Sequence, residues 1–137
     1  MTQSSDEGRA VLLLVEDEDQ IRSLIRSVLA GEDVTILEAS TGAEGLRIAQ
    51  QSAVPIDILL TDMLLPELSG YDLAVALRAM FPALRIIMVT GYVEGDIVQR
   101  GIEELHAAFL DKPFQAAELR RLVADAALHF RATSAQG

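Results

Sequence analysis

The sequence contains no cysteine, which excludes disulfide bonds, thiolate zinc sites and cysteine nucleophiles. Aromatic residues make up only 4% of the chain while hydrophobic residues make up 50%, so the core must be aliphatic. No apolar run approaches the roughly 20 residues that a membrane-spanning helix needs. Residues 1–8 lack the charged and apolar regions of a signal peptide. We therefore expect a cytoplasmic protein, and 137 residues fit one domain with a real core.

Basic residues are also scarce, since 11 of them face 21 acids and give a formal net charge of −10. Lys112 is the only lysine, and the arginines are scattered rather than clustered. Nucleic-acid modules usually carry a basic patch, so we expect neither a nucleic-acid nor a membrane partner. An acidic surface suits a basic protein partner, although the charge could equally serve only to keep the domain soluble.

Apolar segments of strand length alternate five times with helical patterns. The first segment is continuously apolar, which is typical of a strand buried on both faces of a parallel sheet. We expect strands at residues 11–15, 34–38, 56–60, 85–89 and 107–110. We expect helices at residues 21–29, 41–50, 70–80, 96–100 and 119–130, of which the fourth is short and weak between glycines.

This alternation predicts an α/β fold, a doubly wound parallel sheet with helices on both faces. The pattern leaves the strand order open, and the common order for a small sheet of this kind is the flavodoxin-like 2-1-3-4-5. We expect one domain at residues 10–131, between flexible tails at 1–9 and 132–137.

Polar side chains recur where the predicted strands end. Glu16 and Asp17 follow the first strand, Asp62 the third, Thr90 the fourth and Lys112 the fifth. The carboxyl ends of parallel strands meet at one edge of the sheet, where this architecture binds ligands. We therefore expect these five residues to share one pocket.

The residue types in this pocket suit phosphoryl transfer with a hard cation. Three clustered carboxylates repel one another and favour a cation with oxygen ligands such as Mg²⁺. A carboxylate can also act as a nucleophile and carry a phosphoryl group as an acyl phosphate. Lys112 would supply a compact positive charge, and Thr90 a hydroxyl donor.

Four segments together resemble the signature sequences of CheY-like receiver domains of response regulators. They are Val-Leu-Leu-Leu-Val-Glu-Asp-Glu at 11–18, Leu-Thr-Asp-Met-Leu-Leu-Pro-Glu-Leu-Ser-Gly at 60–70, Val-Thr-Gly at 89–91 and Lys-Pro-Phe at 112–114. They occur in the family's order and close to its spacing over about residues 10–131. The segments around Thr90 and Lys112 are similar to those of receivers attached to hybrid histidine kinases.

The resemblance implies a role for each residue in the acidic cluster. Asp62 is expected to be the phosphorylated aspartate. Glu16 and Asp17 are expected to bind Mg²⁺ together with Asp62 and the main-chain carbonyl of Leu64. Glu16 departs from the family, since many members have an aspartate there, and its longer side chain would bind the metal through water. Leu64 and Tyr92 are bulky where the family controls loss of the phosphoryl group.

The resemblance also implies a switch. Thr90 corresponds to the hydroxyl that turns toward the phosphoryl group, Phe109 to the aromatic residue that follows it, and Lys112 to the family's lysine. The Lys112–Pro113 peptide bond corresponds to one that is cis in the family. The implied partners are a histidine kinase or a histidine phosphotransfer protein, and a target bound by the face of the fourth helix, fifth strand and fifth helix. We expect a monomer or weak dimer.

Three other functions stay open at this point. The chain could be a free-standing phosphoryl relay, a part of a hybrid kinase, or a receiver-shaped binding module that works without phosphorylation. An enzyme of the haloacid-dehalogenase phosphatase type would place an Asp-x-Asp motif after the first strand, whereas here the candidate nucleophile Asp62 follows the third. A nucleotide switch would need a glycine-rich phosphate loop that the sequence lacks. We therefore expect a phosphoryl acceptor rather than an enzyme.

Overall fold

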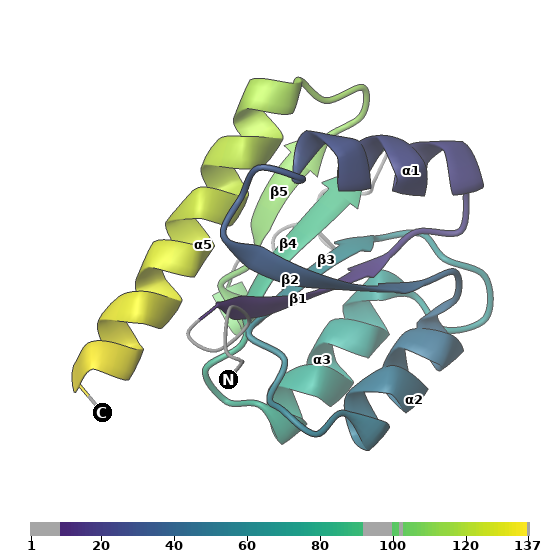
Figure 1. Ribbon diagram of the computed structural model, residues 1–137. Helices are drawn as coiled ribbons and strands as arrows, with labels where there is room; N and C mark the ends of the chain where they lie inside the picture. The colour runs from purple at the N-terminus through teal and green to yellow at the C-terminus, as the bar shows by residue number, and fades with distance from the viewer. Residues whose placement is uncertain (1–8, 92–99, 102, 137) are drawn as a thin grey trace.

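The computed structural model describes residues 9–91, 100–101 and 103–136 (Figure 1). Five parallel strands form one sheet in the order β2-β1-β3-β4-β5, which confirms the predicted fold class and strand order. The strands are β1 (Ala10–Val15), β2 (Val34–Ala39), β3 (Ile58–Asp62), β4 (Arg85–Thr90) and β5 (Ala108–Asp111).

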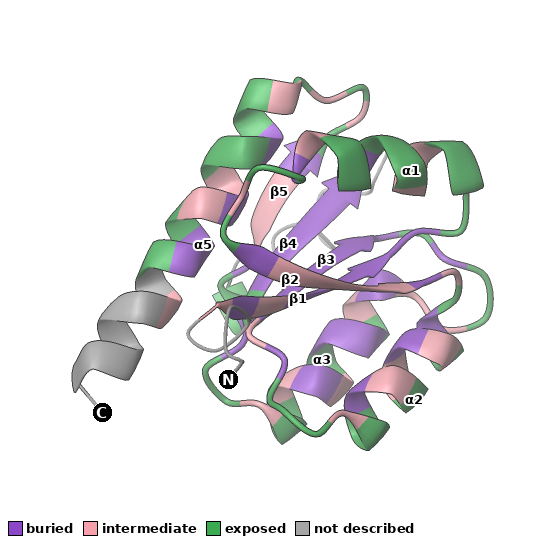
Figure 2. Cartoon of the chain, viewed as in Figure 1, coloured by how far each residue is buried: buried purple, intermediate pink, exposed green. Residues whose placement is uncertain are grey.

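Helices cover both faces of the sheet. The helices are α1 (Asp19–Val28), α2 (Gly42–Gln51), α3 (Gly70–Met80) and α5 (Ala116–Gln136). In Figure 1, α1 and α5 lie on one face, while α2 and α3 lie on the other. The central strands β1 and β3 are buried on both sides, and the outer faces of the helices are exposed (Figure 2).

Alternation along each strand divides the core into two layers. In β1, Leu13 packs in the layer formed with α2 and α3, whereas Leu12 and Leu14 pack in the layer formed with α1 and α5. Nearly all of this core is aliphatic, as the composition predicts. Successive side chains of a strand point to opposite faces, so a continuous apolar run serves both layers.

Side-chain caps fix where two helices begin. The hydroxyl of Thr41 accepts a hydrogen bond from the Glu44 N–H at 3.0 Å, and the Glu44 carboxylate accepts from the Ser40 N–H at 2.8 Å. The first bond is the one that the predicted capping box requires, whereas the Glu44 carboxylate reaches the N–H of the residue before the N-cap rather than that of Thr41 itself. At the start of α3, the Ser69 hydroxyl accepts from the Asp72 N–H at 3.1 Å.

Several boundaries differ from the sequence prediction. Strand β3 begins at Ile58 rather than at residue 56, and just before it the Asp57 carboxylate, not a main-chain oxygen, accepts from the Val11 N–H at 2.8 Å. The strands β3, β4 and β5 extend past their predicted apolar segments and include the polar residues Asp62, Thr90 and Asp111. Helix α5 continues to Gln136, beyond residue 130 where the helix was expected to end, because no proline or glycine stops it before Gly137.

The predicted fourth helix falls mostly outside the described residues, which omit 92–99 and 102; residues 100–101 and 103–105 are helical. Within the described part of the chain, no helix has both the length and the apolar character to cross a membrane.

Candidate metal and phosphoryl-acceptor site

The strand ends bring the predicted site residues to one edge of the sheet. Strand β3 ends in Asp62 and β4 in Thr90, while Glu16 directly follows β1 and Lys112 directly follows β5. The register of the sheet aligns Val15 with Thr61, Asp62 with Val89 and Thr90 with Asp111. Residues almost a hundred positions apart in the chain therefore meet, as the topology predicts.

Three carboxylates form a cluster at this edge. Glu16, Asp17 and Asp62 each offer an oxygen, and these oxygens lie within 4.8 Å of one another. Glu16 is 1% exposed and Asp62 is 7% exposed, while Asp17 faces solvent. The oxygen-only donor set and its open side suit a hard cation such as Mg²⁺, which keeps several waters.

The environment of Glu16 supports this fit. Its Oε1 atom is buried without a hydrogen-bond partner, and its Oε2 atom accepts from the Glu18 N–H at 3.1 Å. Burial raises the pKa of Glu16 from 4.5 to about 7; the Glu18 N–H and Lys112 oppose that rise, and the Asp62 charge adds to it. A bound cation would satisfy the unpartnered oxygen and favour the ionised form.

Lys112 binds the aspartate at the centre of the cluster. Its Nζ atom donates to Asp62 Oδ2 at 2.6 Å and lies 3.7 Å from Glu16 Oε1, too far for a hydrogen bond. Burial alone would lower the pKa of the Lys112 ammonium, but the hydrogen bond and charge of Asp62 outweigh burial and raise it. Asp62 Oδ1 accepts from the Leu64 N–H at 3.0 Å, so both carboxylate oxygens are oriented by donors.

The expected switch residues lie on the two strands that follow β3 in the sheet, Thr90 at the end of β4 and Phe109 in β5. Thr90 is buried, and its Oγ1 atom donates to Asp111 Oδ1 at 3.3 Å rather than to Asp62. Phe109 is half-buried, and its ring lies against Gly101, where an added Cβ would be 2.8 Å from the ring. The Lys112–Pro113 peptide bond is cis, as the resemblance implies. Tyr92 lies outside the described residues.

Two residues that the sequence analysis did not select support the site. Arg22 donates to the main-chain oxygen of Glu16 at 2.7 Å, and it also pairs with Asp19 and Glu38. The only feature of the sequence that points to Arg22 is its position one helical turn after Asp19, where the two side chains can pair. Gly70 packs so closely that a Cβ there would be 2.2 Å from the main-chain oxygen of Asp62.

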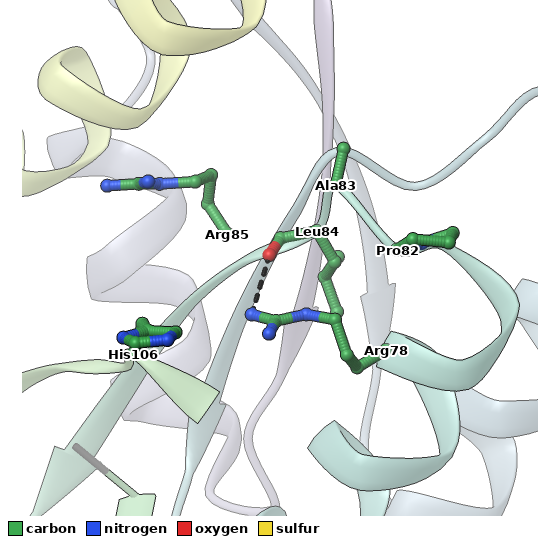
Figure 3. Close-up of a pocket in the computed structure, with 6 residues that line it drawn as sticks. All are labelled: Arg78, Pro82, Ala83, Leu84, Arg85 and His106. Atoms are coloured by element: carbon green, nitrogen blue, oxygen red, sulfur yellow. Dashed lines mark hydrogen bonds between the residues drawn. The ribbon is translucent and has the colours of Figure 1, made fainter. Parts of the chain in front are cut away.

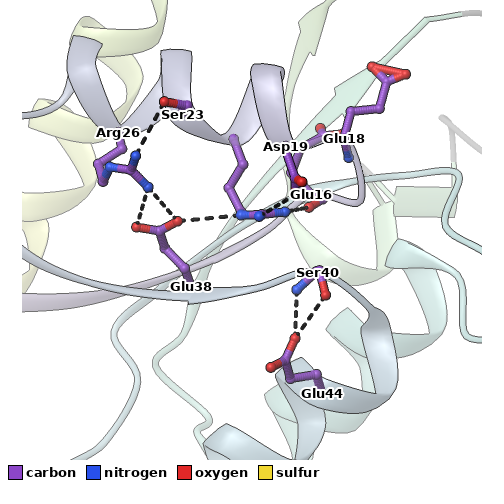
Figure 4. A network of polar contacts seen from close by, with 9 residues as sticks. Glu16, Glu18, Asp19, Ser23, Arg26, Glu38, Ser40 and Glu44 are labelled. Carbon is purple, nitrogen blue, oxygen red and sulfur yellow. Dashed lines mark hydrogen bonds and ion pairs between the residues drawn. The ribbon is translucent and has the colours of Figure 1, made fainter.

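A wider polar network joins α1 to β2 beside the site. Arg26 donates to both carboxylate oxygens of Glu38 at 2.8 and 2.9 Å and to Ser23 at 3.2 Å. Figure 4 shows this network next to Glu16, with Ser40 and Glu44 nearby. These contacts fix α1 against β2 beside the cluster.

The profile of the response regulator receiver domain family matches residues 12–124. The chain belongs to this family. Receiver domains are parts of two-component signalling systems, and the matched region contains all four strand ends that form the site. The resemblance seen in the sequence is thus confirmed over most of the chain.

Curated relatives carry the receiver domain as a small part of a longer protein. A sensor kinase, CckA, of Brucella abortus is 34% identical over 85% of this chain, which covers only 12% of that protein. The DNA-binding transcriptional regulator NtrC of Escherichia coli is 30% identical over 90% of this chain, covering 26% of the regulator. This chain therefore corresponds to one domain of such proteins.

A solved receiver domain shows the same fold. The crystal structure of a response regulator receiver domain protein from Clostridium thermocellum superposes with a TM-score of 0.77 at 30% identity. It aligns with 90% of this chain and 98% of its own. The chemotaxis protein CheY4 of Vibrio cholerae gives a TM-score of 0.74 at 25% identity, over 86% of this chain and 98% of that one.

Proposed function

We propose that Asp62 accepts a phosphoryl group from a phosphohistidine, with Mg²⁺ held by Glu16, Asp17, Asp62 and the main-chain carbonyl of Leu64. The observation that carries this proposal is the pairing of Asp62 with Lys112 beside a buried glutamate oxygen that has no hydrogen-bond partner. The cation, when bound, neutralises charge on the phosphoryl oxygens.

The protein's own groups account for the transfer. Asp62 is held by Lys112 and the Leu64 N–H, so one carboxylate oxygen can attack phosphorus in a fixed orientation. The new O–P bond forms as the P–N bond to the donor imidazole breaks, and the electron pair returns to that nitrogen. Lys112 then pairs with a phosphoryl oxygen instead of the carboxylate. The reaction needs no base on this chain, which suits a phosphoryl acceptor rather than an enzyme.

The switch follows from the charge that the transfer brings. Thr90 leaves Asp111 and donates to the phosphoryl group, and Phe109 moves into the space beside it. The face of the predicted fourth helix, β5 and α5 then shifts population toward a form that binds a target protein. The donor is a histidine kinase or a histidine phosphotransfer protein. We place the domain in the cytoplasm as a monomer or weak dimer.

Intact-mass spectrometry after incubation with a small phosphoryl donor tests this function. The wild type should gain one phosphoryl group from acetyl phosphate, and from phosphoramidate with its P–N bond, only when Mg²⁺ is present. Asp62→Asn should gain none. Asp125→Asn changes an exposed acid of α5 and should behave like the wild type.

The outcome separates this proposal from its alternatives. A folded wild type that gains no phosphoryl group from either donor, nor from a phosphorylated histidine kinase, would identify a binding module that works without phosphorylation. Steady turnover of a generic phosphate ester would instead point to a phosphatase. Equal labelling of the wild type and Asp62→Asn would place the acceptor elsewhere.

A further inference from the structure

A second pocket lies at the amino ends of the strands, opposite to the carboxyl ends that carry Asp62. It is found where β4 and β5 begin, next to the end of α3, and its volume is about 220 Å³. Figure 3 shows its lining residues, which are Arg78, Pro82, Ala83, Leu84, Arg85 and His106. Nothing in the proposed phosphoryl chemistry uses this pocket.

The lining of this pocket is basic in an acidic protein. Two of the described lining residues are arginines, a third is a histidine, and none is an acid. Most other described basic side chains pair with carboxylates. These are Arg9, Arg22, Arg26, Arg47, Lys112 and Arg121. Within the described part of the chain, neither Arg78 nor Arg85 has a carboxylate within 4.0 Å, although acids outnumber bases by 21 to 11.

Arg78 is fixed before any ligand binds. Its Nη2 atom donates to the main-chain oxygens of Leu84 and Leu105, each at 2.8 Å. These two bonds tie the end of α3 to the segments that precede β4 and β5. They use the hydrogens of Nη2 alone, and the Nε atom is buried without a partner. A guanidinium that is already oriented loses little entropy when it binds an anion.

The two arginines are close enough to affect each other. Burial lowers the pKa of Arg78, and the positive charge of Arg85 lowers it further. His106 completes the lining at the residue before Ala107, where its backbone has a positive φ of 54°. Arg78, Arg85 and His106 all line this one pocket, and Figure 3 labels their side chains among the lining residues. An anion there would relieve the repulsion between like charges.

We propose that this pocket binds a phosphate group of a small molecule, held by Arg78, Arg85 and His106. Guanidinium groups bind phosphate oxygens through paired charge-assisted hydrogen bonds, and the imidazole supplies a further donor. A purely structural role for Arg78 accounts for its two carbonyl contacts. Arg85 and His106 are exposed residues of the same lining, so a ligand from solvent can reach them. The site is at the amino ends of the strands and Asp62 is at their carboxyl ends, so binding there does not compete with the acceptor chemistry.

Amide chemical shifts measured during titration with inorganic phosphate test this proposal. The protein is kept in EDTA, and sodium chloride holds the ionic strength constant, so that neither metal nor general screening contributes. The amides of Leu84, Arg85 and His106 should shift and saturate, while those of Asp62 and Thr90 stay fixed. Arg85→Gln should weaken binding about tenfold, as expected for loss of one charge-assisted contact.

Two further variants complete the experiment. Arg120→Gln removes an exposed arginine of α5 and should bind phosphate like the wild type. Arg78→Lys retains the charge but not the planar fork, and should weaken binding while the unfolding midpoint shows that the protein is folded. Shifts that do not saturate, or that persist unchanged in Arg85→Gln, would overturn the site. Binding of succinate but not phosphate would overturn the assignment to phosphate.

Discussion

Replacing Glu16 with glutamine should stabilise the metal-free protein at pH 8 and change its stability little at pH 5. Glu16 is 1% exposed, and burial raises its pKa from 4.5 to about 7. The folded state therefore holds this proton more tightly than the unfolded state does. Stability from this group is fully present below about pH 4.5, falls as the pH rises, and is lost above about pH 7.

The size of the effect follows from the two pKa values. A rise from 4.5 to about 7 corresponds to a loss of about 3 kcal/mol of unfolding free energy once Glu16 is ionised. Glutamine has nearly the same shape and can still accept from the Glu18 N–H, but it carries no charge at any pH. The free energy of unfolding of the variant relative to the wild type should therefore rise by up to about 3 kcal/mol between pH 5 and pH 8.

Urea unfolding in EDTA at both pH values measures this difference. Glu118→Gln, which changes an exposed acid in the first turn of α5, is the matched control and should show no such dependence. Saturating Mg²⁺ at pH 8 should stabilise the wild type by mass action and stabilise Glu16→Gln less. Parallel stability curves for Glu16→Gln and the wild type from pH 5 to pH 8 would refute the reasoning.

Other substitutions test the switch, a cap and the core. Gly101→Ala puts a Cβ 2.8 Å from the Phe109 ring, so the ring must move. We expect changed aromatic NMR shifts and a free energy of unfolding in urea that is lower by about 1–3 kcal/mol. Unchanged ring shifts would contradict the contact. Thr41→Ala removes the acceptor for the Glu44 N–H and should cost about 1 kcal/mol in thermal unfolding, whereas Thr41→Ser should retain most of it. Leu59→Ala in the fully buried strand β3 should cost about 2–5 kcal/mol in urea unfolding, and a loss below about 1 kcal/mol would show that the core collapses around it.

The sequence predicted the parts of this protein that depend on local pattern and on topology. The continuous apolar run of β1 indicated a strand buried on both faces, and the structure confirms it. Glu16, Asp17, Asp62, Thr90 and Lys112 were predicted to share one pocket because each follows or ends a parallel strand. The structure brings Glu16, Asp17, Asp62 and Lys112 together and places Thr90 in register with Asp111. The roles proposed for these residues in phosphoryl transfer stay predictions.

Long side chains that reach distant main-chain atoms were not predictable in this way. Arg22 donates to the main chain six residues earlier, and Arg78 to carbonyls six and 27 residues later. Such contacts depend on how helices are placed on the sheet, which no local periodicity specifies. The start of β3 was wrong for a related reason, since the side chain of Asp57 replaces a main-chain acceptor for Val11.

The pairing of Lys112 with Asp62 gives the molecule a built-in chemical reporter. Lys112 is the only lysine in the sequence, so an amine-reactive reagent can modify one side-chain amine besides the α-amino group. The ammonium is held protonated by its carboxylate partner, and a protonated amine does not react. The rate of modification at this one position, followed by peptide mapping, would report on any event that removes the carboxylate from the amine, without a label introduced by mutation.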